Sequence, residues 1–253
     1  MINSATILKF KFVIVFLLLL LVGNVSVFGQ TPKDFKNSIK FNATNMLLYD
    51  ASYQFSYERM IKENQSINFV FGYQQFPKFI PTLTGFNFQP KGSRSGYSLG
   101  LDYRFYLGKI NKYSGPRGVY LAPFVSYFSF DSSRGFDYTD PDTNVTDSAN
   151  LNMKLDLYNV GGELGYQFVL WDRLVIDCVL FGPSVTTYKY NVKVDGDIPS
   201  LDENELAQKI IEKMRDKFPN IGNITGDEGI TKKGVQSLTA VGFRYNISIG
   251  YRF

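Results

Sequence analysis

The chain has 253 residues and a formal net charge of +4, from 27 Lys and Arg against 23 Asp and Glu, with one cysteine and no histidine. The missing histidine excludes Ser-His-Asp and Cys-His nucleophilic sites and His-ligated zinc. A single cysteine excludes an intrachain disulfide framework. Aromatic residues make up 16% of the chain, too many for disorder, and the charge shows no basic cluster of the kind that binds nucleic acid.

The first 29 residues have the pattern of an export signal. Lys9 and Lys11 flank the start of an eleven-residue apolar run, Phe12–Val22, and Gly29 offers a cleavage position. That run has the length of a signal-peptide core, whereas a membrane-spanning helix needs ~20 apolar residues. We predict that 1–29 is a cleaved signal peptide and that 30–253 is the exported domain; an uncleaved N-terminal anchor is the alternative.

After Gln30 the apolar residues alternate with polar or small ones, which predicts strands with one apolar face. The expected strands are Ser38–Leu47, Ala51–Ile61, Gln65–Gln75, Tyr97–Gly108, Val119–Phe130, Tyr158–Leu170, Leu174–Val194 and Val241–Phe253. The Leu174–Val194 run keeps its apolar residues in one phase throughout. The apolar side chains stand on odd-numbered positions in 151–157 and on even-numbered ones in 158–170, so we expect a β-bulge near Leu157.

Short and long connections alternate along these strands. The short ones are 49–50, 62–65, 109–117 and 171–173, and the long polar ones are 77–94, 131–150 and 195–235. An outer-membrane barrel has this asymmetry, with short periplasmic turns and long external loops. The predicted fold class is therefore all-β, an eight-stranded antiparallel up-and-down transmembrane β-barrel with one short helix in the last extracellular loop.

The two faces of the strands decide between a membrane barrel and a soluble lipocalin-like ligand-binding barrel. In the soluble barrel the apolar face points inward. Here the polar face is rich in glycine and in charges of both signs, which suits the narrow interior of eight strands. The apolar face is rich in Tyr and Phe, which suits contact with lipid. This pattern favours a location in the cell outer membrane.

The last strand resembles the C-terminal insertion signal of Gram-negative outer-membrane barrels. Its alternating apolar residues are Tyr245, Ile247, Ile249, Tyr251 and Phe253. The segments Tyr53–Arg59, Tyr103–Leu107 and Pro116–Phe124 look like a family of small, mostly uncharacterised outer-membrane barrel domains of the OmpA/OmpX type. The resemblance spans 36–253 apart from the insertions. It implies eight strands, contact with outer-membrane lipids and insertion by the barrel-assembly machinery, and it implies no activity.

The polar face carries six charged residues that alternation directs into the lumen: Glu58, Asp102, Arg104, Glu163, Asp177 and Arg244. Unpaired charge in a narrow interior is expensive, so we expect these carboxylates and guanidiniums to pair and close the lumen. The structural interpretation is charge neutralisation. The functional alternative is a gate or a narrow ion path.

Segment 131–150 contains Asp131, Asp137, Asp140, Asp142 and Asp147 against a lone Arg134. These oxygens could offer ligands to calcium, but the spacing and closing Glu of a calcium loop are missing, which favours a solvated acidic loop. Cys178 lies on the apolar face, where an inert thiol is expected.

The 195–235 loop contains the one predicted helix, 201–218. Ser200 and Glu203 form a capping box, and Pro219 ends the helix. Its apolar stripe consists of Leu206, Ile210, Met214 and Phe218. The stripe is expected to pack on the barrel rim; the alternatives are that it binds a protein partner at the cell surface or acts as a lid.

Together these features predict an integral outer-membrane barrel with a structural or surface-interaction role, without catalysis, cofactor or metal. The alternatives are an outer-membrane enzyme, for which a histidine-free acid mechanism would be needed, and a narrow gated channel. Eight strands leave an interior that side chains can fill, which disfavours an open pore.

Overall fold

The computed structural model describes residues 35–49, 51–75, 83, 85–111, 115–140, 143–196 and 235–253, the last segment from 239 onward with its side chains. The predicted signal peptide, 1–29, lies outside these residues. So does the predicted helix 201–218 with its stripe of Leu206, Ile210, Met214 and Phe218.

The described chain is built almost entirely of strands. They are β1 (Asn37–Asn42), β2 (Ser52–Lys62), β3 (Gln65–Gln74), β4 (Phe86–Phe88), β5 (Ser93–Tyr106), β6 (Gly118–Thr139), β7 (Thr146–Leu170), β8 (Leu174–Asp195) and β9 (Val235–Arg252). One six-residue helix, α2 (Ala43–Leu48), follows β1. In the part of the chain that the structure describes, no helix has the length and hydrophobicity needed to cross a membrane.

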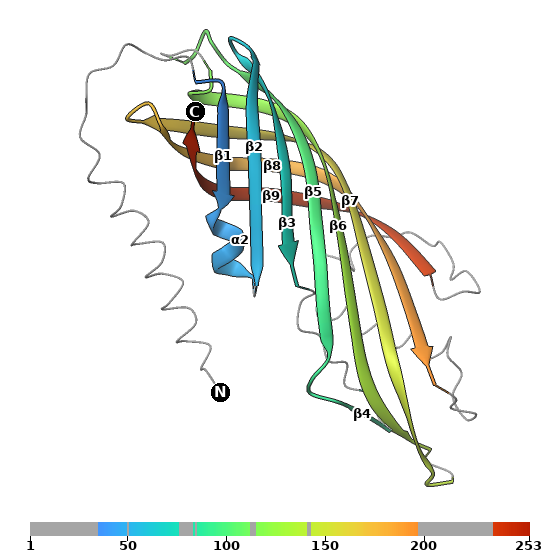
Figure 1. Cartoon of the computed structure of the whole chain (residues 1–253). Coiled ribbons are helices and arrows are strands. Elements are labelled where there is room, and N and C mark those ends of the chain that lie inside the picture. The colour runs from blue at the N-terminus through green and yellow to red at the C-terminus, as the bar shows by residue number, and fades with distance from the viewer. Residues whose placement is uncertain are drawn as a thin grey trace.

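Eight of the strands close into an antiparallel ring (Figure 1). The order around the ring is β1, β2, β3, β5, β6, β7, β8 and β9, and β9 returns to β1 through pairs such as Ser38↔Arg252. The three-residue β4 lies outside the ring and pairs with β6 alone. The fold is thus an all-β, eight-stranded up-and-down barrel, as the alternation predicted.

In the part of the barrel nearer the C-terminus, the inner face of the ring is polar and the outer face is apolar. Ser66, Asn68 and Ser98 are buried inside, whereas Phe69, Phe71 and Leu99, on the same strands, are 47%, 46% and 53% exposed outside. A soluble barrel has the opposite arrangement. Successive strand residues point to opposite faces, so the sequence alternation fixes this orientation directly.

Several strand boundaries differ from the sequence prediction. The last strand, expected from Val241, already begins at Val235 in β9. The segment expected to continue the first strand to Leu47 turns at Asn42, whose side chain accepts the Asn45 N–H and starts α2. The Thr44 hydroxyl of α2 then accepts the Ile247 N–H of β9, which β1 is too short to pair. The expected loop 131–150 is mostly a hairpin, because β6 runs to Thr139 and β7 begins at Thr146. The expected loop 77–94 includes β4 and the start of β5.

Strands β6, β7 and β8 have 22, 25 and 22 residues, against the ~9–11 that a tilted strand needs to cross a membrane. They continue well past β1, β2 and β3, at the end away from the C-terminus (Figure 1). We call this continuation the extension. Its inner face is an apolar core that includes Phe136, Leu151 and Met153, with Phe86 and Phe88 of β4 packed against it.

The expected bulge near Leu157 is wrong. The β7 register runs without interruption through this position against both β6 and β8. Odd-numbered residues point inward along all of β7. In the extension they are apolar, as at Leu151, Met153 and Leu155. Between the extension and the C-terminal end of the strand most of them are polar or small, as at Asn159, Glu163 and Gln167. The irregularity lies in β8 instead, between Val179 and Gly182, where Leu180 and Phe181 are both exposed.

A row of tyrosines marks the boundary between the apolar outer belt and the extension. Tyr53, Tyr73 and Tyr97 are cross-strand neighbours on β2, β3 and β5. The row continues with Tyr127 and Tyr158 on β6 and β7, whose ring centroids are 4.9 Å apart. At the other end of the belt, Phe168, Trp171 and Tyr251 are exposed. Aromatic girdles of this kind mark the two interfaces of membrane barrels.

Candidate functional site

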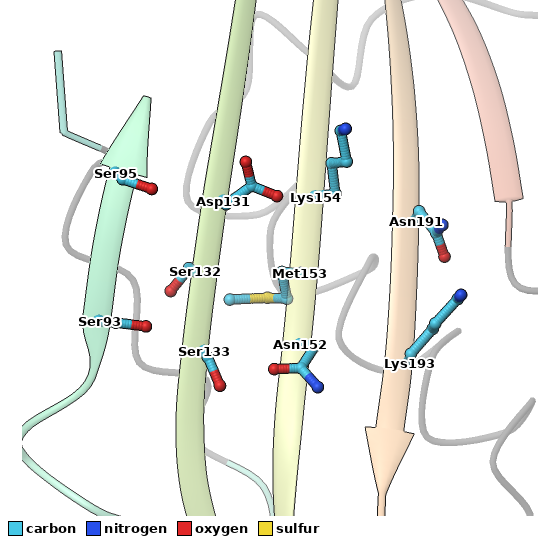
Figure 2. Close-up of a pocket in the computed structure, with 10 residues that line it drawn as sticks. All are labelled: Ser93, Ser95, Asp131, Ser132, Ser133, Asn152, Met153, Lys154, Asn191 and Lys193. Atoms are coloured by element: carbon cyan, nitrogen blue, oxygen red, sulfur yellow. The ribbon is translucent and has the colours of Figure 1, made fainter. Parts of the chain in front are cut away.

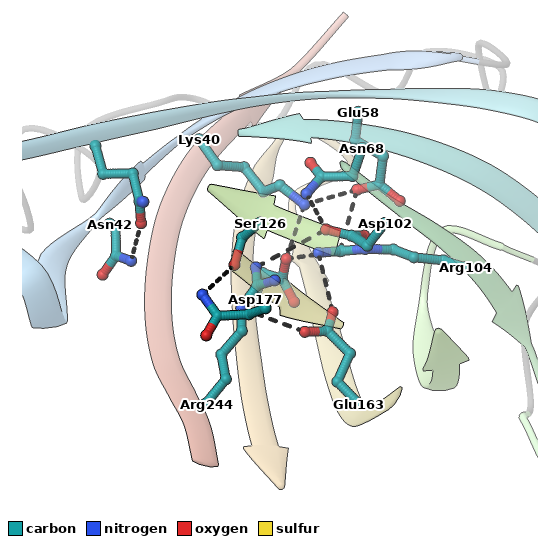
Figure 3. A network of polar contacts seen from close by, with 12 residues as sticks. Lys40, Asn42, Glu58, Asn68, Asp102, Arg104, Ser126, Glu163, Asp177 and Arg244 are labelled. Atoms are coloured by element: carbon teal, nitrogen blue, oxygen red, sulfur yellow. Dashed lines mark hydrogen bonds and ion pairs between the residues drawn. The ribbon is translucent and has the colours of Figure 1, made fainter. Parts of the chain in front are cut away.

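The lumen contains a network of charged side chains from strands that are distant in sequence (Figure 3). All six residues expected from the sequence belong to it: Glu58, Asp102, Arg104, Glu163, Asp177 and Arg244. A seventh, Lys40, completes the network. Except for Arg244, each of these residues is at most 2% exposed, so their charges are compensated almost entirely by one another.

Arg104 is at the centre of the network. Its Nε lies 2.6 Å from Asp102 Oδ1, and its Nη1 lies 2.7 Å from Asp177 Oδ2. Nη1 also donates to Gln167 Oε1 at 3.2 Å, and the guanidinium lies 4.4 Å from the centre of the Tyr120 ring. A guanidinium offers five N–H donors in a plane, and this geometry lets one side chain hold groups from several strands.

Lys40 bridges Glu58 and Asp177, and it shares the second of these with Arg104. Its Nζ donates to Glu58 Oε2 and to Asp177 Oδ2, each at 2.8 Å, and to Gln167 Oε1 at 3.2 Å. The sequence prediction missed Lys40, although the alternation of β1 could have identified it. Ser38, Lys40 and Asn42 form its buried face, opposite Ile39 and Phe41.

Neutral donors satisfy the remaining oxygens of Glu58, Asp177 and Asp102. Tyr106 Oη and Ser66 Oγ both donate to Glu58 Oε1, at 2.6 and 2.5 Å. Tyr120 Oη donates to Asp177 Oδ1 at 2.8 Å. Asn68 Nδ2 donates to Asp102 Oδ2 at 2.8 Å. The sequence prediction placed Tyr106 on the polar face but gave it no role, and it left the orientation of Tyr120 open.

Glu163 is held more loosely than the other carboxylates. Its oxygens lie 3.4 Å from Arg244 Nε and 3.9 Å from Arg104 Nη2, and neither oxygen has a hydrogen bond. Arg244 also approaches Asp102 at 3.8 Å and lies 4.9 Å from the Phe124 ring centre. Glu163 is therefore held by ion pairs of 3.4 and 3.9 Å, whereas Asp177 is held by Arg104 and Lys40 at 2.7 and 2.8 Å.

The network connects every strand of the ring across the lumen. Its charged members come from β1, β2, β5, β7, β8 and β9, and Asn68 and Tyr120 add β3 and β6. Beside it remains a cavity of about 10 Å³ lined in part by Arg104, Asp177 and Arg244, roughly the space of one water molecule. The arrangement links the strands to one another across the lumen and fills the lumen with side chains.

The acidic residues of segment 131–150 are dispersed along the β6–β7 hairpin. Asp131 faces outward on β6, Asp137 accepts a hydrogen bond from Ser148 Oγ at 2.6 Å, and Asp140 accepts the Thr143 N–H in the turn. Among the described residues no group of three His, Cys, Asp or Glu side chains has a metal-binding arrangement. Cys178 is half-buried on the outer face.

The residues of the C-terminal motif lie on the outer face of β9. Tyr245, Ile247, Tyr251 and Phe253 are exposed there, and Ile249 is half-buried. The Phe253 backbone exchanges hydrogen bonds with Asn37, so the terminal residue lies beside the start of β1.

No protein-family model and no curated protein matches the sequence, so the resemblance to small outer-membrane barrels stands without a family assignment. Among solved structures, the crystal structure of Acinetobacter baumannii CarO is similar to this chain. The two are 10% identical, with a TM-score of 0.38 over 88% of this chain and 100% of CarO. A likeness this distant supports no inference about this chain.

Proposed function

We propose that the chain is an integral outer-membrane β-barrel with a structural and surface-interaction role and without catalytic activity. The observation that supports it is an apolar belt on the outside of a ring whose interior is polar and closed. On β7 the outer apolar residues run from Tyr158 to Leu170. Twelve residue spacings of ~3.3 Å at a tilt of ~40° correspond to about 30 Å of height, the thickness of a hydrocarbon core.

The charge network supports a closed barrel over a conducting one. An ion passing along the lumen would have to separate short, buried ion pairs, and breaking such pairs costs several kcal/mol. A narrow gated channel therefore ranks below the structural role. An outer-membrane enzyme ranks lower still, because the network carboxylates are engaged with Arg104 and Lys40 and are buried away from any substrate.

The proposed partners follow from three surfaces. The outer belt would contact outer-membrane lipids. The β9 residues ending in Phe253 would engage the barrel-assembly machinery during insertion, and the 195–235 loop would contact a protein at the cell surface. No cofactor is part of the proposal.

Fractionation tests the membrane location and conductance tests the closed lumen. We expect the protein to stay in outer membranes washed with high salt and carbonate and to migrate differently on mild gels before and after heating, because a closed barrel has no free edge at which to unfold. In planar lipid bilayers the purified barrel should add no steady conductance. Recovery as a soluble protein in the periplasmic wash would contradict the location, and stable open channels would contradict the closed lumen.

A further inference from the structure

The extension has a cavity lined by residues of four neighbouring strands (Figure 2). It lies a few residues beyond the tyrosine row, on the side away from the apolar belt. Its volume is about 320 Å³, at the lower end of the range for small-ligand sites. Four adjacent strands, β5 to β8, line it with Ser93, Ser95, Asp131, Ser132, Ser133, Asn152, Met153, Lys154, Asn191 and Lys193. Eight of these ten residues are polar and lie on the outer face of their strands, in contrast to the apolar belt, whereas Ser132 and Met153 belong to the buried inner face of β6 and β7.

The polar groups of this cavity are short of partners. Lys154 and Lys193 are both exposed, and within the described residues no hydrogen bond or ion pair engages either ammonium group. Asn191 Oδ1 is buried without a hydrogen-bond donor. Two lysines face a single carboxylate, Asp131. The cavity thus offers a net positive charge together with a buried acceptor that needs an N–H or O–H.

The row of residues below the cavity is, by contrast, internally satisfied. Tyr127 Oη and Ser129 Oγ donate to Asp156 Oδ1 at 2.9 and 2.7 Å, and Lys189 Nζ lies 5.1 Å from the centre of the Tyr158 ring. This row separates the cavity from the apolar belt.

The side of the cavity nearest the tyrosine row lies at the height of the headgroup layer, and its far side lies beyond that layer. Its residues lie two to four positions beyond Tyr97 and four to six beyond Tyr127 and Tyr158. At ~3.3 Å per residue and a tilt of ~40°, this is about 5 to 15 Å above the tyrosines. Lipid headgroups begin at the tyrosine level and occupy the first several Å of that interval.

We infer that this cavity binds the headgroup of a phosphorylated glycolipid in the outer leaflet. The ammonium groups of Lys154 and Lys193 pair with its phosphate, as lysine does with phosphates generally. A sugar hydroxyl donates to Asn191 Oδ1, and the serines and Asn152 surround the rest of the saccharide. The acyl chains descend over Tyr97, Tyr127 and Tyr158 onto the apolar belt. The inference rests on the proposed membrane location and adds a lipid class to it.

A binding experiment with the refolded, full-length mature barrel tests the assignment. The barrel is reconstituted in nanodiscs of neutral phospholipid and titrated with an acylated, phosphorylated glucosamine disaccharide of the lipid A type. Bound lipid is counted by native mass spectrometry. We expect the K154Q/K193Q variant to bind at least ten-fold more weakly than the wild type. The K62Q/K109Q variant, which loses the same charge from exposed positions at the opposite end of the barrel, should bind as the wild type does.

Two altered ligands distinguish the source of the interaction. The dephosphorylated glycolipid should bind the wild type at least ten-fold more weakly and should not distinguish it from K154Q/K193Q. The deacylated headgroup should also bind more weakly than the intact lipid. Equal affinity of all variants overturns the site, and equal affinity for the deacylated headgroup overturns its assignment to a membrane lipid. Heat-modifiable migration and carbonate resistance are measured in parallel, so a failure of the membrane location is seen separately.

Discussion

Removing the charge of Arg104 should destabilise the barrel more than any other single neutralisation in the lumen. Arg104→Met takes away contacts of 2.6 and 2.7 Å to Asp102 and Asp177. It leaves four carboxylates (Glu58, Asp102, Glu163 and Asp177) facing Lys40 and Arg244 alone. Breaking a buried pair by removing one partner costs ~3–5 kcal/mol, which is roughly 10²- to 10⁴-fold in the unfolding equilibrium constant.

The magnitude can be measured by urea unfolding of the barrel in lipid vesicles, with the folded fraction counted from its mobility on unheated gels. Arg59→Met is the matched control, because Arg59 is exposed and makes one hydrogen bond, to Asn37 at 3.2 Å. Its loss should cost less than ~1 kcal/mol. Arg104→Glu, with five carboxylates against two cations, should be worse than Arg104→Met.

The paired variant Arg104→Met with Asp177→Asn removes one charge of each sign. Lys40 then keeps Glu58, and Asp102 keeps Asn68 and Arg244. We expect this double variant to be more stable than the sum of the two single changes predicts, by ~1–3 kcal/mol, as for other residues that share a network. Additive effects, or a cost of Arg104→Met below ~1 kcal/mol, would show that water and not these carboxylates surrounds the guanidinium.

Three further predictions concern other parts of the barrel. Gly165→Ala should lower stability by ~1–3 kcal/mol, because its Cβ would overlap the end of the Tyr120 side chain. Gly162→Ala should be tolerated, because its Cβ would lie 4.0 Å from Ala122 O, an ordinary van der Waals distance. Equal unfolding midpoints of the two variants would refute the packing. Phe253→Ala should reduce assembly in cells, measured as the heat-modifiable fraction in outer membranes, and normal levels would mean that the C-terminal motif is coincidental. Deleting 197–232 with a short linker should leave a folded, inserted barrel, because β8 and β9 already pair up to Asn191↔Val235; loss of insertion would place that segment in the folding core.

The barrel and its luminal residues were predictable because both depend on a two-residue period. Alternation alone assigned Asp102 and Arg104 to one face and Leu101 and Tyr103 to the other, and the ring then brought the charges together. Lys40 follows from the same rule applied to a six-residue strand. The distances within the network were not predictable, since they depend on the register between strands that sequence patterning does not specify.

The sequence prediction placed the strand irregularity wrongly, because a switch of the apolar residues from one face of a strand to the other gives the same sequence pattern as a β-bulge. Along β7 the apolar residues move from the outer to the inner face with no bulge at Leu157. In the proposed membrane location this is the level at which lipid gives way to water. Along β8 the irregularity at Val179–Gly182 reverses the faces once, and the change of surroundings reverses the apolar pattern again. The two reversals cancel, so Leu174 and Val194 have the same phase in the sequence although they face opposite sides of the sheet.

Because the strands differ in length, the end of the barrel that carries the extension is asymmetric around the barrel axis. A barrel whose strands all end at one height offers the same contour to neighbours on every side. Here β1, β2 and β3 stop close to the tyrosine row. Strands β6, β7 and β8 continue beyond the ends of these strands on one side of the barrel, at the end away from the C-terminus (Figure 1). In the proposed membrane location, a neighbouring protein would meet short strands on one side of the barrel and long strands on the other. Lateral association of this barrel would therefore favour one side over the other.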